Sequence, residues 1–400
     1  MAKTLASYFL KTAVHQGPGA RAMLPDLLAS LGGKRAVLFT DQGLVKAGVA
    51  DMITRLFDLP HKGYGIELAG VFDKIPQDAE STVIDEAAKY FRDVRGDALI
   101  ALGGGSVQDS VKGIKYLMHK NKEHILDLMP ANFLFEAWPN AQLITIPHIG
   151  LPTTAGTGAE VSVGGVIYNA KEKVKADFGH PFIGPDVAIL DPELTVTLPK
   201  HLTAATAFDA LTHAIEGVAS PASNIFVDAF GFEAVKKIKQ NLPKVMENLG
   251  DVEARNELLG ASAIAILSFV YAIPGAFPVH NFAHAMGAHY RVHHGTANAI
   301  FLTPIMEEIP SLYLPKVEGL AKALDLPVQG KSKETLLQDV IADLVTLRRA
   351  CGLPDDFKPF NVPTSAIFDL TMAVMKDPIG LMYPVPMDVI GNVLGKVVID

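Results

Sequence analysis

Residues Ala98–Tyr116 read ALIALGGGSVQDSVKGIKY, and this segment indicates the architecture of the N-terminal half of the chain. An apolar run typical of a buried strand leads into three glycines, Gly103, Gly104 and Gly105, and then into a helical pattern. Backbone N–H groups at such a helix start can hold a phosphate, which the helix dipole also favours. Gln108 stands where the full G-x-G-x-x-G fingerprint has its third glycine, so a turn needed only for close packing remains the alternative.

The same alternation of strand and helix continues on both sides of this segment. RAVLFT (35–40), DALIAL (97–102) and AQLITIP (141–147) have the pattern of strands, and residues 42–59 have the pattern of a helix. This order predicts βαβ units and a parallel, Rossmann-like sheet. From about His201 onward the chain consists of long helical patterns, which predict an all-α C-terminal region.

A chain of 400 residues exceeds the usual size of one domain, so we expect two. The change of pattern places them at residues 1–198 and 199–400. Ligands often bind in a cleft between two domains, and we expect such a cleft in this protein.

The composition excludes several classes of protein. The single cysteine, Cys351, rules out an internal disulfide framework or a cysteine-rich metal site and is typical of the reducing cytoplasm. With 35 Lys and Arg against 43 Asp and Glu, the formal charge is −8, which argues against a nucleic-acid partner. The N-terminal apolar stretch is too short and too interrupted for a signal peptide.

Residues 258–290 contain no Asp, Glu, Lys or Arg, and the run ASAIAILSFVYAIPGAFPV within them is long enough to span a bilayer. Pro274, Gly275 and Pro278 interrupt this run, and histidines follow it directly. We therefore expect a helix buried inside the protein and no membrane span.

Two further segments offer candidate ligand-binding residues in the N-terminal half. Asp41 follows the strand-like run at 35–40, where a carboxylate could bind a ribose diol and repel a 2′-phosphate, although it could equally be a helix N-cap. Thr153, Thr154 and Thr157 supply small hydroxyl side chains after a strand-like run, but an ordinary loop has much the same composition.

Histidines are concentrated in one short segment of the C-terminal half. The stretch VHNFAHAMGAHYRVHHG (279–295) contains His280, His284, His289, His293 and His294. In FDALTHAIEG, Asp209 and His213 are four residues apart and lie on one face of a predicted helix. A single histidine on an apolar helix is more often a core residue hydrogen-bonded to the backbone than a metal ligand. Burying several histidines in an uncharged segment, however, costs free energy unless a metal or substrate satisfies them. The cluster therefore predicts a metal site of His and carboxylate ligands.

Four motifs together resemble the iron-dependent alcohol dehydrogenase family: GGGSVQDSVK, PTTAGTGAEVS, DALTHAIEG and VHNFAHAMGAHYRVHHGTANAI. They occur in the family's order, and the resemblance extends from FLKTAVHQGPGA near the start to KDPIGLMYPVPM near the end. It implies the dehydroquinate-synthase-like fold, with an α/β dinucleotide-binding domain followed by an α-helical metal-binding domain.

The resemblance implies the metal ligands Asp209, His213, His280 and His294. The metal would be divalent, Fe(II) by resemblance, with Zn(II) as the alternative that this donor set also suits. His284 matches a histidine close to the substrate and the nicotinamide, where it would assist proton transfer. His289 and His293 match no ligand of the family, and we expect them to be structural or to face solvent.

The resemblance also implies an NAD site. The pyrophosphate would bind Gly103, Gly104, Gly105 and Ser106, with Asp109 in the same motif. Thr153, Thr154 and Thr157 would line the dinucleotide. Asp41 matches the acid that favours NAD over NADP.

The predicted function is that of an NAD- and metal-dependent alcohol dehydrogenase or aldehyde reductase, acting on small alcohols or aldehydes and assembled as a homodimer or a higher homo-oligomer. The chain departs from the family at 271–279, YAIPGAFPV, where Ile273, Phe277 and Pro278 predict a narrow, apolar pocket.

One alternative is a dehydroquinate-synthase-like lyase, but its phosphate- and carboxylate-bearing substrate would require basic residues, and none occurs between 258 and Arg291. The other is a nucleotide- or metal-binding protein without catalysis.

Overall fold

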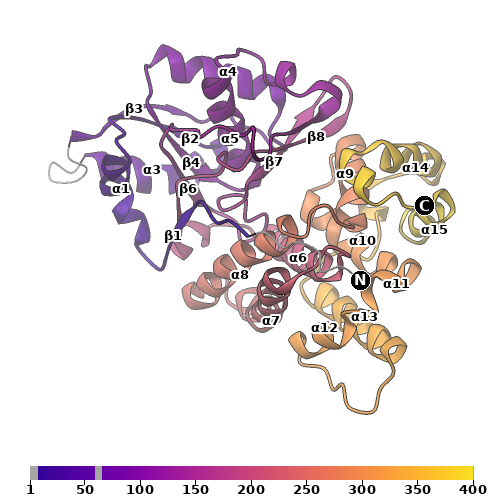
Figure 1. Cartoon of the computed structure of the whole chain (residues 1–400). Coiled ribbons are helices and arrows are strands. Elements are labelled where there is room, and N and C mark those ends of the chain that lie inside the picture. Colours follow the sequence, from indigo (N-terminus) through magenta and orange to yellow (C-terminus); the bar gives the residue numbers. More distant parts are fainter. Residues whose placement is uncertain (1–7, 59–64, 400) are drawn as a thin grey trace. The chain divides into compact units, whose positions relative to one another are not determined.

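The computed structural model describes residues 8–58 and 65–399 (Figure 1). The chain divides into two compact units. The α/β unit comprises Leu10–Leu198, and the helical unit comprises the chain from Pro199 onward together with Tyr8 and Phe9.

A parallel six-stranded sheet forms the centre of the α/β unit. Its strands lie in the order β1-β9-β6-β4-β2-β3, and every neighbouring pair is parallel. The strands are β1 (Ala13–Gln16), β2 (Arg35–Phe39), β3 (Glu67–Phe72), β4 (Ala98–Gly103), β6 (His148–Pro152) and β9 (Val187–Leu190). The strand order reverses beside β2 and β4, and in sheets of this type ligands bind at the carboxyl ends of the strands next to such a reversal.

Helices cover both faces of this sheet (Figure 1). They are α1 (Leu24–Ser30), α2 (Gln42–Lys46), α3 (Val49–Thr54), α4 (Ser81–Asp93) and α5 (Gly105–Lys120). Val37 and Phe39 of β2 pack in one hydrophobic cluster with α4 and α5, while Ala36 and Leu38 pack in a second cluster with α1 and α3. Burial of both faces explains why the central strands are continuous apolar runs.

The structure differs from two sequence predictions in this unit and contains a sheet that the sequence did not predict. The strand predicted at 141–147 is wrong, because the chain pairs with β4 only from His148 to Pro152, and Leu143 is 62% exposed. The predicted helix at 42–59, of which residue 59 lies outside the described residues, is interrupted at Gly48, whose φ of 75° lies in the left-handed region. A second sheet, in the order β5-β8-β7, was not predicted; its strands are β5 (Phe133–Phe135), β7 (Gly164–Asn169) and β8 (Val174–Gly179).

The second unit is helical, as predicted. Its helices are α6 (Lys200–Ala219), α7 (Ile225–Glu247), α8 (Val252–Val270), α9 (Pro278–Tyr290), α10 (His294–Glu308), α11 (Pro310–Tyr313), α12 (Val317–Ala323), α13 (Lys333–Ala350), α14 (Ile367–Lys376) and α15 (Met387–Val397). The apolar segment is divided into α8 and α9, because Pro278 begins a new helix at its first position. Among the residues described, no helix is both long and apolar enough to cross a membrane. The predicted fold class, a parallel α/β region followed by an all-α region, is confirmed.

Candidate functional site

Three predicted cofactor segments lie at one edge of the six-stranded sheet. Asp41 follows β2, Gly103 ends β4, and Thr153 follows β6. Because β2, β4 and β6 are neighbouring parallel strands, their carboxyl ends meet at this edge. The sheet therefore brings together residues that are more than a hundred positions apart in the sequence.

The glycine loop (residues 103–105) and the threonine loop (residues 153–157) are in direct contact. The N–H of Thr153 donates to the carbonyl of Gly103 at 3.2 Å. A Cβ atom on Gly104 would lie 3.2 Å from the side chain of Thr154, and one on Gly105 would lie only 2.5 Å from Cγ2 of Thr157. Glycine at 105 is therefore required by the close approach of the two loops, and no side chain caps α5 where it begins.

Replacing Gly105 with alanine is expected to lower the free energy of unfolding by about 1–3 kcal/mol, the usual cost of overpacking. The added methyl would meet Cγ2 of Thr157 at 2.5 Å, so Thr157→Ser in the same chain is expected to restore part of the loss. The measurement is urea unfolding of both variants. The matched control is Gly391→Ala on α15, where a Cβ atom has open space. Equal stability of Gly105→Ala and the wild type would contradict the close approach.

Ser106 and Asp109 are held by contacts within the α/β unit. The hydroxyl of Ser106 accepts the N–H of Asp78 at 2.9 Å. One carboxylate oxygen of Asp109 accepts Nζ of the fully buried Lys112, and the other accepts the N–H of Val166 on β7, both at 3.0 Å. Asp109 therefore ties the start of α5 to β7.

Asp41 is the N-cap of α2. Its carboxylate accepts the N–H of Leu44 at 3.0 Å, so the helix-cap interpretation holds. An N-cap carboxylate keeps further lone pairs for another donor, and capping therefore does not compete with binding a ribose.

The helical unit brings the four predicted metal ligands together. Asp209 and His213 lie on α6, His280 on α9 and His294 at the first position of α10. Ligand atoms of Asp209, His213 and His280 all lie within 4.8 Å of one another. Nε2 of His294 is 3.4 Å from Oδ1 of Asp209, and Nε2 of His280 is 3.6 Å from the same oxygen. Three imidazoles and one carboxylate around one point are a donor set that fits a divalent metal such as Fe(II) or Zn(II).

The charges within this donor set stabilise one another. Burial alone would raise the pKa of Asp209, but His213, His294 and His280 lower it well below its ordinary value. Burial would lower the pKa of His280, whereas Asp209 and Glu216 raise it to about 9. Protonation of His280 and metal binding at its ring therefore compete.

Two buried residues that sequence analysis missed contact the donor set. The carboxylate of Glu216 is 2.5 Å from Nδ1 of His280. The amide nitrogen of Asn298 donates to Oδ1 of Asp209 at 2.7 Å and lies 3.2 Å from Nε2 of His294. Each has a signal in the sequence, since Glu216 is three residues after His213 and Asn298 four after His294, on the same helix faces.

Phe269 forms an apolar side of the donor set. Its ring centroid is 4.9 Å from that of His213 and 4.6 Å from that of His280. The ring of Phe277 packs at a tilt against that of Phe269, with the ring centroids 4.0 Å apart, whereas Ile273 is 41% exposed. The aromatic side chain that contacts the ligands is therefore Phe269, with Phe277 packed against it.

The other three histidines of residues 279–295 have different surroundings. His284 is buried, and its ring lies 5.4 Å from that of His294. Its Nδ1 is 3.4 Å from Oδ1 of Asp377. His289 is exposed, and His293 is the N-cap residue of α10.

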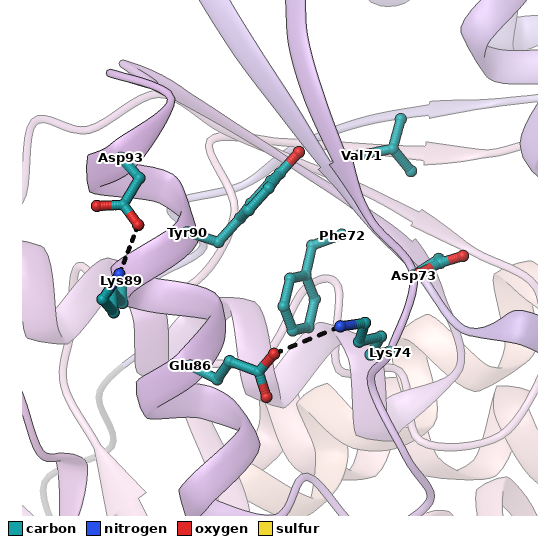
Figure 2. Close-up of a pocket in the computed structure, with 8 residues that line it drawn as sticks. All are labelled: Val71, Phe72, Asp73, Lys74, Glu86, Lys89, Tyr90 and Asp93. Atoms are coloured by element: carbon teal, nitrogen blue, oxygen red, sulfur yellow. Dashed lines mark hydrogen bonds and ion pairs between the residues drawn. The ribbon is translucent and has the colours of Figure 1, made fainter.

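A pocket of 240 Å³ lies elsewhere, between β3 and α4 of the α/β unit (Figure 2). Figure 2 shows two ion pairs among its charged side chains, Lys74 with Glu86 at 3.6 Å and Lys89 with Asp93 at 2.7 Å. Its lining includes no predicted site residue. Neither its charges nor its position connects it with the candidate site.

Family models of known proteins match both halves of this chain. The iron-containing alcohol dehydrogenase family model matches residues 11–192, and the model of the C-terminal region of the Fe-containing alcohol dehydrogenase family matches residues 203–391. Together the two matches cover most of the chain.

Individual relatives are similar over almost their whole length. The NAD-dependent methanol dehydrogenase of Bacillus methanolicus is 30% identical over 373 residues, which cover 93% of this chain and 94% of that protein. The lactaldehyde reductase of Escherichia coli K12 is 30% identical over 361 residues, covering 90% and 91%. The solved structure of a 1,3-propanediol oxidoreductase has a TM-score of 0.88 and 27% identity, covering 98% of this chain and 99% of that one.

These matches confirm the resemblance seen in the sequence, and the lyase and non-catalytic alternatives do not hold. The chain belongs to the iron-containing alcohol dehydrogenase family, and it is an oxidoreductase that acts on CH–OH donors.

Proposed function

We propose that this protein interconverts small alcohols and aldehydes with NAD as the hydride carrier and Fe(II) as the metal. The observation that carries the proposal is the donor set of Asp209, His213, His280 and His294, drawn together from three helices. Residues 1–198 would bind the dinucleotide and residues 199–400 the metal.

The donor set orients the substrate. When bound, the divalent metal supplies a Lewis acid for the substrate oxygen. In the oxidative direction the carbinol carbon loses hydride to the nicotinamide and the hydroxyl loses its proton. Phe269, against His213 and His280, excludes water from one side and favours apolar substrates.

We propose that His284 moves the released proton. Its ring lies beside His294, and Asp377 at 3.4 Å can stabilise the imidazolium that forms. A neutral imidazole can take up the proton and pass it on, whereas alanine at this position cannot.

The glycine loop and the threonine loop form the proposed dinucleotide site. The N-terminus of α5 has no side-chain cap, follows Gly103 and Gly104 and begins with Gly105, an arrangement suited to a pyrophosphate. Thr153, Thr154 and Thr157 would line the dinucleotide, and Asp109 would support the loop through Lys112 and β7.

The substrate is proposed to be short. Proteins similar to this chain are a methanol dehydrogenase, a lactaldehyde reductase and a 1,3-propanediol oxidoreductase. The test is anaerobic oxidation of NADH with a panel of short aldehydes, on metal-stripped protein and on protein reloaded with Fe(II) or Zn(II). Turnover only after reloading supports the proposal. NADH binding without turnover for any aldehyde and metal would contradict it.

Replacing Asp41 with asparagine is expected to shift the preference between NAD and NADP toward NADP by about fivefold, because removing a like charge near a 2′-phosphate is worth about 1 kcal/mol. Asparagine can still accept the N–H of Leu44, so α2 keeps its cap. The measurement is kcat/KM for both cofactors. Asp51→Asn, which removes an exposed charge from nearby α3, is the matched control. An unchanged ratio would remove Asp41 from cofactor selection.

We also propose a cytoplasmic homodimer or higher homo-oligomer. The single cysteine suits a reducing compartment. The edge strand β1 exposes 41% of Val14, so an apolar side chain is available for contact with a second copy. Light scattering would determine the oligomeric state.

A further inference from the structure

We propose that Glu216 is a positioning residue for the metal centre, which fixes the ring of His280 so that Nε2 is the nitrogen offered to the metal. This inference rests on the proposed metal site. Glu216 is fully buried on α6. One of its carboxylate oxygens accepts the N–H of Val279 at 2.6 Å, and the other is 2.5 Å from Nδ1 of His280 and 3.4 Å from the N–H of the same residue.

The carboxylate determines which ring nitrogen of His280 carries hydrogen. An ionised carboxylate only accepts hydrogen bonds, so the nitrogen facing Glu216 must be Nδ1–H. In the metal-binding ring the lone pair then lies on Nε2, which points toward Oδ1 of Asp209 at 3.6 Å. A histidine bonded to a carboxylate through its other nitrogen is held in one tautomer and one orientation and is a stronger ligand.

Glu216 also fixes the position of α9 relative to α6. The first turn of a helix leaves N–H groups without partners inside the helix, and α9 begins with Pro278, which has none to offer. The next two N–H groups, of Val279 and His280, both point to Glu216. Asp209, His213 and Glu216 are spaced as i, i+4 and i+7 on one face of α6. A single helix face therefore supplies two ligands and the group that aligns a third.

The glutamine variant separates this role from simple packing. Glutamine keeps the volume of Glu216, but it has one acceptor oxygen where the carboxylate has two. It cannot accept from both Val279 and His280 as the carboxylate does, and its NH₂ group would favour a ring with hydrogen on Nε2. Aspartate keeps the charge but is shorter by one methylene, so Glu216→Asp is expected to retain part of the function.

The experiment measures metal affinity and the state of the His280 ring. Wild type, Glu216→Gln and Glu216→Asp are stripped of metal, and Zn(II) affinity is measured by competition with a chromophoric chelator. We expect Glu216→Gln to raise the dissociation constant about 10- to 100-fold, the usual effect of removing a residue that orients a ligand. In Zn(II)-loaded wild type, proton NMR is expected to show His280 Nδ1–H far downfield and slow to exchange, a signal assigned by its loss in His280→Gln.

The matched control is Glu257→Gln on α8, which removes a partly exposed carboxylate paired with Lys237 at 2.6 Å. Its zinc affinity is expected to equal that of the wild type. Equal affinity of Glu216→Gln and the control would overturn the proposal, and so would a wild-type spectrum in which zinc is bound at Nδ1 of His280. If Glu216→Gln does not fold, Glu216→Asp and the wild-type spectrum still decide.

These readouts distinguish the failure of this inference from failure of the proposed function. Neither depends on turnover, so a missing aldehyde reductase activity leaves the zinc and NMR results unaffected. A wild type that binds no zinc would refute the metal site and Glu216's role together. A wild type that binds zinc as tightly as Glu216→Gln would refute only the role of Glu216.

Discussion

Replacing His280 with alanine is expected to lower turnover by more than about 100-fold. Changing a residue that only orients a metal ligand usually costs up to about 100-fold, and losing the ligand itself should cost more. The variant loses one of three imidazoles from the donor set. It also leaves the carboxylate of Glu216 buried without the ring N–H at 2.5 Å, which adds a desolvation cost. Metal content by elemental analysis and kcat with a short aldehyde and NADH measure the two effects.

The matched control is His289→Ala on the same helix. His289 is exposed and is not among the predicted ligands, so its replacement is expected to leave both metal content and turnover close to wild type. If His280→Ala retained full metal content and at least a tenth of the wild-type turnover, His280 could not be a ligand of a catalytic metal.

Replacing Glu160 with glutamine is expected to change how stability depends on pH. Glu160, three residues after Thr157, is buried, and burial raises the pKa of its carboxyl group to about 7, despite the opposing charge of Lys112. Because the folded-state pKa exceeds the ordinary value of 4.5, the folded protein holds an extra proton between pH 4.5 and 7. This stabilisation is fully present below pH 4.5 and is lost as pH rises through 7.

Glutamine does not titrate in this range, so the variant does not lose stability through this group as pH rises. The stability of Glu160→Gln relative to wild type is therefore expected to rise by about 2–3 kcal/mol between pH 5 and pH 8. Urea unfolding at the two pH values measures it. Glu67→Gln, which removes an exposed carboxylate of the same unit, should show no such change. A parallel pH dependence of Glu160→Gln and wild type would show that Glu160 is ionised throughout.

The parallel sheet could be predicted because its central strands carry their own signal. β2 and β4 are buried on both faces and appear as unbroken apolar runs. The strand predicted at 141–147 was wrong because its composition is equally apolar, and only pairing with β4 and β9 identifies residues 148–152 as the strand. The second sheet pairs β5 with β8 across some forty residues, a contact that no local pattern reveals.

From spacing alone, only those site residues that lie on the same helix could be predicted to lie together. Asp209 with His213 follows from helix geometry, but their convergence with His280 and His294 came from the family resemblance. The roles of Glu216 and Asn298 were not predicted, because they depend on which helices face each other. Glu216 lies one turn beyond His213, yet its partners are the N–H groups and the ring at the start of α9.

The arrangement of the donor set has a consequence for the unfolded chain. Asp209 and His294 are separated in sequence by all of α7, α8 and α9, and the chain has no disulfide because it has one cysteine. A metal held by both residues would join the ends of that long segment only in the folded protein, because the unfolded chain has no preformed site and releases the ion. Metal binding would therefore add to the free energy of unfolding in a chain whose single cysteine can form no internal disulfide.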